Sequence, residues 1–366
     1  MYDIVYVFKN NRKDSFIKNK IQAKEMYYGL THLSTMYNVQ IIEFENKKNK
    51  RLLKKIDRLL SKFLSLPIYF SMVLSIKNFK TLLKSRNIIL VNESVACSLL
   101  PFLLILKVFT KKNIIFFVMG LYSKEINFTS LKILHNLYIK MIKSCVSNLL
   151  FLGRGEFEIA KDLHKSDKKL NIFPFSTDTN FWQESRIQKK KSEKYIVFVG
   201  NDSNKDFEKV KNLALNLIDF KFKIITSNEI LLNVNAPNIE IISGEWGSSN
   251  LEDADLRKIY QGAILSIIPL KESSQPSGQS VALQCMSLGV PVMISKTQGF
   301  WDYENFQHEE NIIFIEDTTL YNWQNKIIYY LKNEEVLNRV SINAKKLVNS
   351  KYNLETFYNK LLTFLI

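Results

Sequence analysis

The chain has 366 residues, of which 46% are apolar and 12% aromatic, and only 11 are glycine and 7 proline. This composition excludes a disordered, collagenous or low-complexity protein, and the length predicts two domains. Three widely spaced cysteines, Cys97, Cys145 and Cys285, do not form a disulfide framework or a paired-cysteine zinc motif. A reducing, cytoplasmic location is therefore predicted.

The positive charge is concentrated in the first half of the chain. Lys and Arg exceed Asp and Glu by 51 − 35 = 16. Residues 1–185 contain 30 basic and 14 acidic side chains, whereas residues 186–366 contain 21 of each. This asymmetry indicates an anionic partner for the first half, either nucleic acid or an anionic membrane.

Apolar runs typical of buried strands alternate with helical stretches along the chain. The strands predicted in the first half are Ile4–Phe8, Val39–Phe44, Asn87–Val91, Asn113–Val118 and Ser147–Leu152. Those in the second half are Tyr195–Val199, Phe222–Thr226, Ile239–Ile242, Ala263–Ile268, Pro291–Ile294 and Asn311–Ile315. Strand–helix alternation with continuous apolar strands predicts parallel, doubly wound sheets. The predicted fold is therefore α/β, with two Rossmann-like domains.

The break between the two series is polar and falls at about residues 176–194. We therefore predict an N-terminal domain over 1–183 and a C-terminal domain over 190–351. The chain opens directly on a strand, without the basic and apolar regions of a secretory signal. The longest apolar stretch, Val95–Phe109, contains Pro101 and is too short to span a membrane. It is predicted to be a buried helix.

Two strand–loop–helix segments in the second half have the character of anion sites. In the first, a strand ends at Val199–Gly200 and a polar loop leads through Lys205 to a helix near Phe207. A backbone amide and an ammonium group there would both favour a phosphate. An ordinary β–α turn with a solvated lysine is the alternative interpretation.

The second segment runs from Ile268 to Val292 and joins a strand, a small-residue loop, a helix and the next strand. Amide groups of Ser277, Gly278, Gln279 and Ser280 come together at the predicted start of the helix Ser280–Leu288, where the helix dipole favours an anion. Gln284 lies four residues after Ser280, on the same side of that helix, within reach of a ribose hydroxyl. A capped helix after a serine-rich loop is the alternative.

The second segment resembles the signature of glycosyltransferase family 4 (group 1), whose members have two facing Rossmann-like domains in the arrangement called GT-B. Residues 284–292, Gln-Cys-Met-Ser-Leu-Gly-Val-Pro-Val, are similar to the second half of that signature. Residues 174–181 are similar to the family's interdomain segment, and residues 152–158 and 299–303 resemble two further family segments.

The resemblance implies roles for individual residues. Gly200 and Lys205 would flank the diphosphate of a nucleotide-sugar donor, with Lys205 stabilising the leaving group, and the loop amides at 277–280 would hold the same diphosphate or the sugar. Gln284 would contact the ribose, and residues 352–366 would return to the N-terminal domain. No divalent metal or other cofactor is implied, because basic side chains and helix dipoles replace it, and transfer would retain the anomeric configuration.

The chain departs from the family pattern at several positions. Gln284 replaces the second signature glutamate, and Glu272 is the candidate for the first through a longer loop. Asn201, a candidate donor-binding residue, stands where the family often has arginine, and Met119–Gly120 stands where many members have a histidine. The usual glycine-rich loop after the first strand is replaced by residues 9–14. We nevertheless predict activity, with Lys205 and Glu272 as catalytic residues, because the phosphate-binding elements remain.

A basic amphipathic helix is predicted near residues 47–64. Five apolar residues recur at helical spacing: Leu52, Ile56, Leu59, Leu60 and Phe63. Basic residues occupy eight other positions: Lys47, Lys48, Lys50, Arg51, Lys54, Lys55, Arg58 and Lys62. Such a helix suits the headgroup region of an anionic bilayer. The alternative is a surface helix that packs its apolar stripe on the sheet.

Other side chains carry weaker signals. The four histidines share no metal-ligand spacing and are interpreted as structural or solvated. Trp246 and Gly120 are candidates for contacts with the base or sugar, although packing is the alternative for the tryptophan. No general base is evident, but the leaving phosphate is able to take up the acceptor's proton in a front-face mechanism.

The predicted protein is a glycosyltransferase, peripheral to the inner face of the plasma membrane. It would transfer a sugar from a nucleotide-diphosphate sugar to a glycan or lipid-linked oligosaccharide in surface-polysaccharide synthesis. Three alternatives stay open: a nucleotide-sugar epimerase of the same fold, a degenerate non-catalytic membrane-peripheral binding protein, and a nucleic-acid binder. The last depends on charge alone, since no nucleic-acid-binding motif is recognisable.

Overall fold

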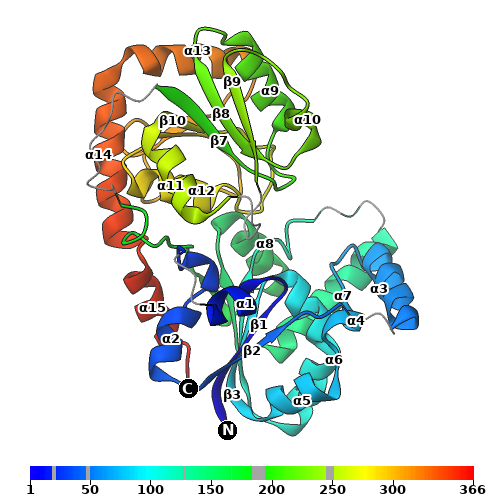
Figure 1. The fold of residues 1–366 in the computed structure, drawn as a ribbon. Helices are drawn as coiled ribbons and strands as arrows, with labels where there is room; N and C mark the ends of the chain where they lie inside the picture. Colours follow the sequence, from blue (N-terminus) through cyan, green and yellow to red (C-terminus); the bar gives the residue numbers. More distant parts are fainter. Residues whose placement is uncertain are drawn as a thin grey trace. The chain divides into compact units, whose positions relative to one another are not determined.

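The computed structural model describes residues 1–18, 22–46, 50–124, 126, 129–165, 167–183, 194–244 and 251–366 (Figure 1). Its residues form two compact units. Unit 1 comprises Met1–Ile21, Met26–Pro174 and Tyr358–Ile366, and unit 2 comprises Gln22–Glu25 and Phe175–Phe357. A short segment near the N-terminus thus belongs to unit 2.

Unit 1 is built on a six-stranded parallel sheet with the order β2-β1-β3-β4-β5-β6. The strands are β1 (Tyr2–Phe8), β2 (Val39–Glu43), β3 (Ser85–Val91), β4 (Asn113–Val118), β5 (Asn148–Phe151) and β6 (Leu170–Ile172). The first five confirm the predicted strands within two residues at each end. The sixth was missed, because only three residues pair with β5 and the turn-forming sequence that follows them masks the pattern.

Eight α-helices of unit 1 surround this sheet within the described ranges. They are α1 (Arg12–Ile17), α2 (Leu30–Met36), α3 (Arg51–Leu64), α4 (Phe70–Val73), α5 (Ile76–Leu83), α6 (Glu93–Phe109), α7 (Thr129–Cys145) and α8 (Arg154–His164). The apolar stretch around Pro101 is α6, and most of its residues are buried in the core as predicted. No helix in the described part of the chain is long and apolar enough to cross a membrane.

The end of the chain pairs with buried amides of unit 1. The side-chain nitrogen of Asn87 donates to the Ile366 carbonyl at 3.0 Å, and that of Asn113 donates to the Phe364 carbonyl at 2.7 Å. These residues follow α15 (Leu354–Leu362), and Tyr358–Ile366 belongs to unit 1. Buried amide groups of β3 and β4 are thus satisfied by a segment more than 250 residues away.

Unit 2 contains a second six-stranded parallel sheet, with the order β12-β11-β10-β7-β8-β9. Its strands are β7 (Tyr195–Val199), β8 (Lys221–Thr226), β9 (Ile239–Ser243), β10 (Ala263–Ile268), β11 (Val292–Ser295) and β12 (Ile313–Ile315). All six were predicted, with shifts of one or two residues at some ends. The order is that of a doubly wound parallel sheet, in which the connections change direction between β7 and β10.

Helices lie on both faces of the second sheet (Figure 1). They are α9 (Phe207–Asn216), α10 (Glu229–Leu232), α11 (Asp253–Gly262), α12 (Gln279–Ser287), α13 (Leu320–Lys332) and α14 (Glu334–Lys351). Helix α9 contacts α10 and α13, and α12 contacts α14. The predicted helix Phe207–Ile218 ends two residues earlier than expected, and the predicted helix Ser280–Leu288 begins and ends one residue earlier.

Residues 176–183, predicted as the start of a linker, are packed against unit 2. The Thr177 amide donates to the Tyr352 carbonyl at 2.8 Å, and the Trp182 ring is completely buried. The remainder of the predicted linker, residues 184–193, lies outside the described residues. The turn-forming sequence therefore indicated the irregular backbone of this segment, but it did not indicate that Trp182 is buried in the core.

Candidate functional site

The candidate site lies at the carboxyl end of the sheet in unit 2. Strands β7 and β10 are neighbours, and the loops that leave them lead to helices on opposite faces of the sheet. In open parallel sheets a ligand crevice forms at such a change of direction. The loop after β7 contains Gly200–Lys205, and the loop after β10 runs from Pro269 to Gly278. The two sequence motifs thus meet at one place.

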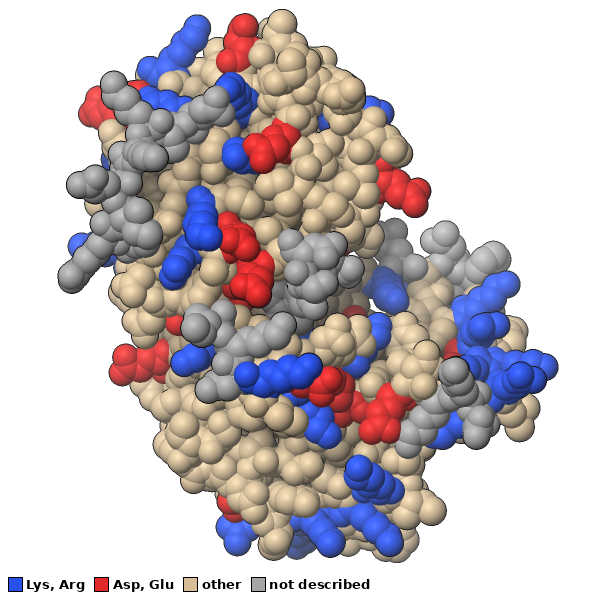
Figure 2. Space-filling model, in the orientation of Figure 1, with Lys and Arg blue, Asp and Glu red and all other residues tan. Residues whose placement is uncertain are grey.

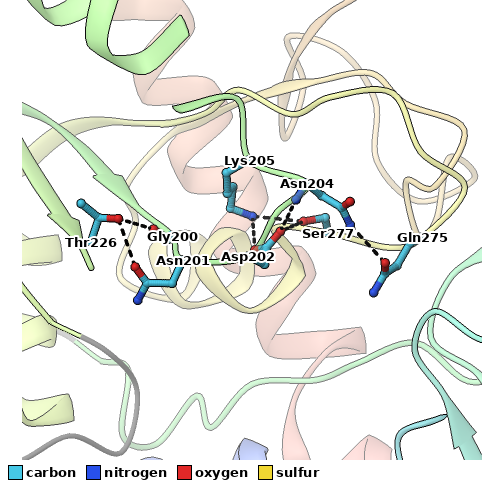
Figure 3. A network of polar contacts seen from close by, with 8 residues as sticks. All are labelled: Gly200, Asn201, Asp202, Asn204, Lys205, Thr226, Gln275 and Ser277. Carbon is cyan, nitrogen blue, oxygen red and sulfur yellow. Dashed lines mark hydrogen bonds and ion pairs between the residues drawn. The ribbon is translucent and has the colours of Figure 1, made fainter. Parts of the chain in front are cut away.

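Lys205 is the central side chain of this site. Only 1% of the residue is exposed, and its Nζ lies 3.0 Å from Oδ2 of Asp202 and 3.2 Å from Oγ of Ser277 (Figure 3). Burial lowers the pKa of Lys205, and the Asp202 carboxylate opposes that shift. The predicted solvated-lysine alternative is therefore wrong.

The stem of Lys205 passes directly over Gly200. A Cβ atom on Gly200 would lie 2.8 Å from Cε and 2.9 Å from Cγ of the lysine. A side chain at this position would displace the lysine from the site. Glycine is thus required here by close approach of a side chain rather than by an unusual backbone angle.

The ammonium group of Lys205 also lies beside the N-terminus of α12. Gly278 is the N-cap residue of that helix, with φ of +78°, and a Cβ atom on it would be 3.7 Å from Nζ of Lys205. This N-cap provides no side-chain acceptor for the amide groups of the first turn. Ser277 and Gly278 therefore lie beside the lysine, and a role for the amide groups of Gln279 and Ser280 stays a prediction. A helix N-terminus and a buried cation at the same point favour an anion.

Asp202 supplies the anion in this structure. In addition to the lysine contact, its Oδ1 accepts hydrogen bonds from Oγ of Ser277 at 3.0 Å and from the Asn204 amide at 3.2 Å. Burial alone would raise the pKa of Asp202, but Lys205 and these hydrogen bonds lower it overall. Its side chain is 52% exposed. An anionic ligand approaching Lys205 thus has to compete with this carboxylate.

Asn201 has a structural part in the same loop. Its Nδ2 donates to the Gly244 carbonyl at 2.9 Å, and its Oδ1 accepts from the Ser227 amide. The same Oδ1 accepts from Oγ1 of Thr226 at 3.0 Å (Figure 3). Both ends of the amide are thus used to join the carboxyl ends of β7, β8 and β9. This arrangement gives no direct support to a contact between Asn201 and the donor.

Glu272 lies on the loop after β10, where it braces the backbone. Its Oε1 accepts hydrogen bonds from the Gln298 amide at 2.9 Å and from the Ser273 amide at 3.1 Å. The Gly299 amide donates to the Ser273 carbonyl at 2.8 Å, so the two loops are joined in two places. The described contacts of Glu272 are with this backbone, and its catalytic role stays a prediction.

Gln284 lies within a buried polar network. Its Nε2 donates to Oε1 of Glu25 at 2.8 Å, and its Oε1 lies 3.4 Å from the Tyr260 hydroxyl. Glu25 also accepts from Nε1 of Trp182 at 2.7 Å. Burial is the largest cause of a raised Glu25 pKa, about 7, which the hydrogen bonds from Gln284 and Trp182 partly offset. A ribose contact by Gln284 would require rearrangement of this network.

The remaining predicted site residues lie elsewhere or outside the described residues. Gly120 follows β4 in unit 1, where the Ser123 hydroxyl donates to its carbonyl. Trp246, Lys47 and Lys48 belong to the ranges that the structure does not describe. On and before α3, Arg51, Lys55, Arg58 and Lys62 are exposed, whereas Lys50 donates to the Leu74 carbonyl and Lys54 to the Asn46 side chain.

Sequence reasoning missed Asp202 and Glu25. Asp202 stands three residues before Lys205, and this spacing was a usable signal for an ion pair. Glu25 had no such signal, because its partner Gln284 is 259 residues away. Among the described residues, no group of three or more His, Cys, Asp or Glu side chains is arranged to hold a metal ion.

Comparisons with known proteins give a consistent fold. No family model matches the sequence, and neither does any curated protein. Among solved structures, sucrose-phosphate synthase from Thermosynechococcus elongatus superposes with a TM-score of 0.71 and 12% identity over 99% of this chain and 98% of that one. Alr3699/HepE from Anabaena, solved with UDP-glucose, superposes with a TM-score of 0.69 and 12% identity, over 100% of this chain and 99% of that one. A glycosyltransferase from Rickettsia africae superposes with a TM-score of 0.64 and 12% identity, over 100% of this chain and 97% of that one. The chain thus has the GT-B fold.

Proposed function

We propose that this protein is a glycosyltransferase that uses a nucleotide-diphosphate sugar as its donor. The observation that carries the proposal is the buried Lys205 ammonium at the N-terminus of α12, where the connections of the sheet change direction. A diphosphate combines the charge and the acceptor oxygens that this arrangement favours. Similar structures solved with UDP-glucose, UDP, or UDP and glucose support a uridine nucleotide as the first candidate.

The proposed chemistry needs only groups that this chain provides. The bond between the sugar's anomeric carbon and the diphosphate oxygen breaks, and a bond from the acceptor hydroxyl oxygen to that carbon forms. The leaving phosphate takes the hydroxyl proton, and the configuration is retained. Lys205 and the amide groups at 278–280 stabilise the negative charge that develops on the diphosphate. No divalent metal is required in this proposal, because these groups supply the positive potential.

The proposed acceptor is a glycan or lipid-linked oligosaccharide at the inner face of the plasma membrane, in surface-polysaccharide synthesis. The support is the excess of 30 basic over 14 acidic side chains in residues 1–185. Lipid diphosphates and anionic headgroups both carry the opposite charge. The basic residues 1–185 would then bind the acceptor, while unit 2 binds the donor.

Nucleotide binding is the direct test of the donor site. Calorimetric titration of the purified protein with UDP, GDP, ADP and CMP, each with and without Mg²⁺, should give binding by one nucleotide that does not require the metal. Lys205→Ala should weaken that binding at least about tenfold, the equivalent of one charge-assisted hydrogen bond. Lys209→Ala is the matched control, since Lys209 is also ion-paired to an aspartate three residues away. Equal affinities of the two variants would refute the assignment of the diphosphate site.

A non-catalytic nucleotide-binding protein is the second candidate. The observation in its favour is that Gln284 stands at a signature glutamate position and is bonded to Glu25 instead of facing open space. Incubation with nucleotide-sugars of the nucleotide that binds, together with membrane lipid extract, distinguishes the two candidate functions. Released nucleoside diphosphate together with a glycosylated product supports the enzyme, and tight binding without turnover supports the second candidate. A nucleotide-sugar epimerase would convert the donor sugar without any acceptor.

A further inference from the structure

Helix α3 presents its apolar stripe to solvent. Leu52, Ile56, Leu59 and Phe63 are 73%, 37%, 56% and 52% exposed. Their spacing of four, three and four residues places them on one side of the helix. The alternative prediction, that this stripe packs on the sheet, is therefore wrong for these four residues. Only Leu60, the fifth residue of the predicted stripe, is partly buried against the core.

A different side of α3 attaches the helix to unit 1. Asp57 is buried, and its carboxylate accepts hydrogen bonds from the amides of Phe70 and Ser71 and from the Ser71 hydroxyl at 2.6 Å. Ser61 Oγ donates to the Ile68 carbonyl and accepts from the Ile68 amide. Leu64 is part of the core. These anchors define the rotation of the helix about its axis, so exposure of the apolar stripe is built into the fold.

The neighbouring helix α7 exposes a second apolar strip. The two helices are in contact, and Nδ1 of His135 on α7 lies 2.6 Å from the Leu64 carbonyl at the end of α3. On the solvent side of α7, Ile133, Leu134 and Leu137 are 64%, 49% and 53% exposed. Lys132 and Lys140 are exposed on the same helix. Two adjacent helices thus each expose apolar side chains that are flanked by basic ones.

Basic side chains border the stripe of α3. Arg51, Lys55, Arg58 and Lys62 are exposed and recur every three to four residues, as the apolar residues do. In Figure 2 the blue side chains gather over this helix at the right of the view. No acidic residue of α3 is exposed, since Asp57 is buried. A row of cations beside a row of protruding apolar side chains matches the boundary between anionic headgroups and acyl chains.

We propose that the solvent-facing sides of α3 and α7 bind an anionic lipid bilayer, with Leu52, Ile56, Leu59 and Phe63 inserted among the lipids. A nucleic acid would satisfy the cations but leave the apolar side chains in water. The bilayer is then the anionic partner of residues 1–185 in the proposed function. The binding surface includes apolar residues of α7 as well as those of the predicted basic helix, and its test requires no nucleotide.

Vesicle co-sedimentation tests the surface. The full chain should bind vesicles of equal parts phosphatidylcholine and phosphatidylglycerol much more tightly than vesicles of phosphatidylcholine alone. The variant Leu59→Gln/Phe63→Gln should bind the mixed vesicles at least about tenfold more weakly, because insertion of apolar surface is lost. Arg58→Gln/Lys62→Gln should lose a similar factor at low salt, where exposed charges are least screened. Ile342→Gln on α14, where Ile342 is 67% exposed, is the matched control and should bind normally.

Three outcomes would overturn the inference. The first is equal vesicle binding by the Leu59/Phe63 variant and the wild type, with unchanged circular dichroism in both. The second is equal binding to the two kinds of vesicle. The third is binding to a nucleic-acid duplex that is weakened by the Arg58/Lys62 variant alone. Titration with UDP separates the two proposals. The Leu59/Phe63 and Arg58/Lys62 changes lie in unit 1 and should leave UDP binding unchanged, whereas Lys205→Ala lies in unit 2 and should weaken it. Failure at either site leaves the other testable.

Discussion

At the scale of single residues, the site is defined by a cation that already has an anionic partner. Lys205 is buried against Gly200 and Gly278, and the Asp202 carboxylate lies 3.0 Å from its ammonium group. A buried lysine without a counter-ion would be strongly destabilising. Asp202 therefore stabilises the free protein, and for the same reason it competes with any diphosphate that enters.

Removing that competition should strengthen nucleotide binding. We expect Asp202→Asn to bind UDP about three- to tenfold more tightly than the wild type, because the ligand no longer displaces a carboxylate from Lys205. Calorimetric titration measures the change. Asp255→Asn, which removes the exposed Asp255–Lys258 pair of the same spacing, should leave the affinity unchanged. Weaker UDP binding by Asp202→Asn would show instead that Asp202 assists the ligand.

The buried Glu25 predicts a pH dependence of stability. Its pKa is raised by burial from 4.5 to about 7, so the charged form is disfavoured in the folded protein. The stabilising contribution of the protonated Glu25 carboxyl group is fully present below about pH 4.5 and is lost as the pH rises to about 7. Relative to Glu25→Gln, the wild type should therefore lose up to about 3 kcal/mol of unfolding free energy over that interval. Urea unfolding followed by tryptophan fluorescence at pH 5 and pH 8 measures the difference, and parallel pH profiles of the two proteins would contradict the prediction.

At the scale of elements, the N-terminus of α12 depends on a glycine with a left-handed backbone. Gly278 has φ of +78°, and a Cβ atom there would lie 2.8 Å from Cγ2 of Ile268. Both the backbone strain and the contact with β10 oppose any other residue. The same residue places the first-turn amides beside Lys205, so local conformation and electrostatics have a common origin.

Substitution of this glycine should affect both stability and binding. We expect Gly278→Ala to lower the unfolding free energy by about 1–3 kcal/mol and to weaken UDP binding, because the first turn of α12 shifts from Lys205. Gly289, just after the same helix, also has a left-handed backbone with φ of +76°. Gly289→Ala should cost similar stability but leave UDP affinity unchanged. Thermal unfolding and titration of the two variants check this, and equal UDP affinities would show that the helix N-terminus makes no contact.

At the scale of the whole molecule, the two halves of the sequence differ in charge and in the proposed partner. The net charge of 30 − 14 = +16 in residues 1–185 contrasts with zero in residues 186–366. Exposed charges are screened by salt, whereas a buried lysine at a helix N-terminus is screened much less. The two binding events should therefore respond differently to ionic strength.

Raising the NaCl concentration from about 0.1 M to 1 M shortens the screening length from about 10 Å to 3 Å. The protein should then be released from anionic vesicles, while its affinity for UDP changes by less than about threefold. Co-sedimentation and calorimetry at the two concentrations measure both quantities. Retention on the vesicles at high salt would mean that the apolar residues of α3 and α7 are sufficient without the charges.

Local sequence determined much of this protein. Continuous Ile, Val, Leu and Phe runs predicted eleven of the strands, because a strand buried on both faces admits few polar residues. Gly200, Lys205 and the loop before α12 were identified as a candidate anion site, because glycine, lysine and a helix start are recognisable from neighbouring residues. The resemblance at residues 284–292 implied the GT-B fold, which the comparisons confirm.

Tertiary structure decided the features that depend on distant residues. Periodicity shows which residues of α3 share a side, but the hydrogen bonds of Asp57 to residues 70 and 71 select the side that is buried. Glu25 and Gln284 meet only because the chain returns residues 22–25 to unit 2. The three-residue strand β6 exists only because β5 lies beside it. In each case the stabilising partner is absent from the local sequence, so no local pattern could have indicated it.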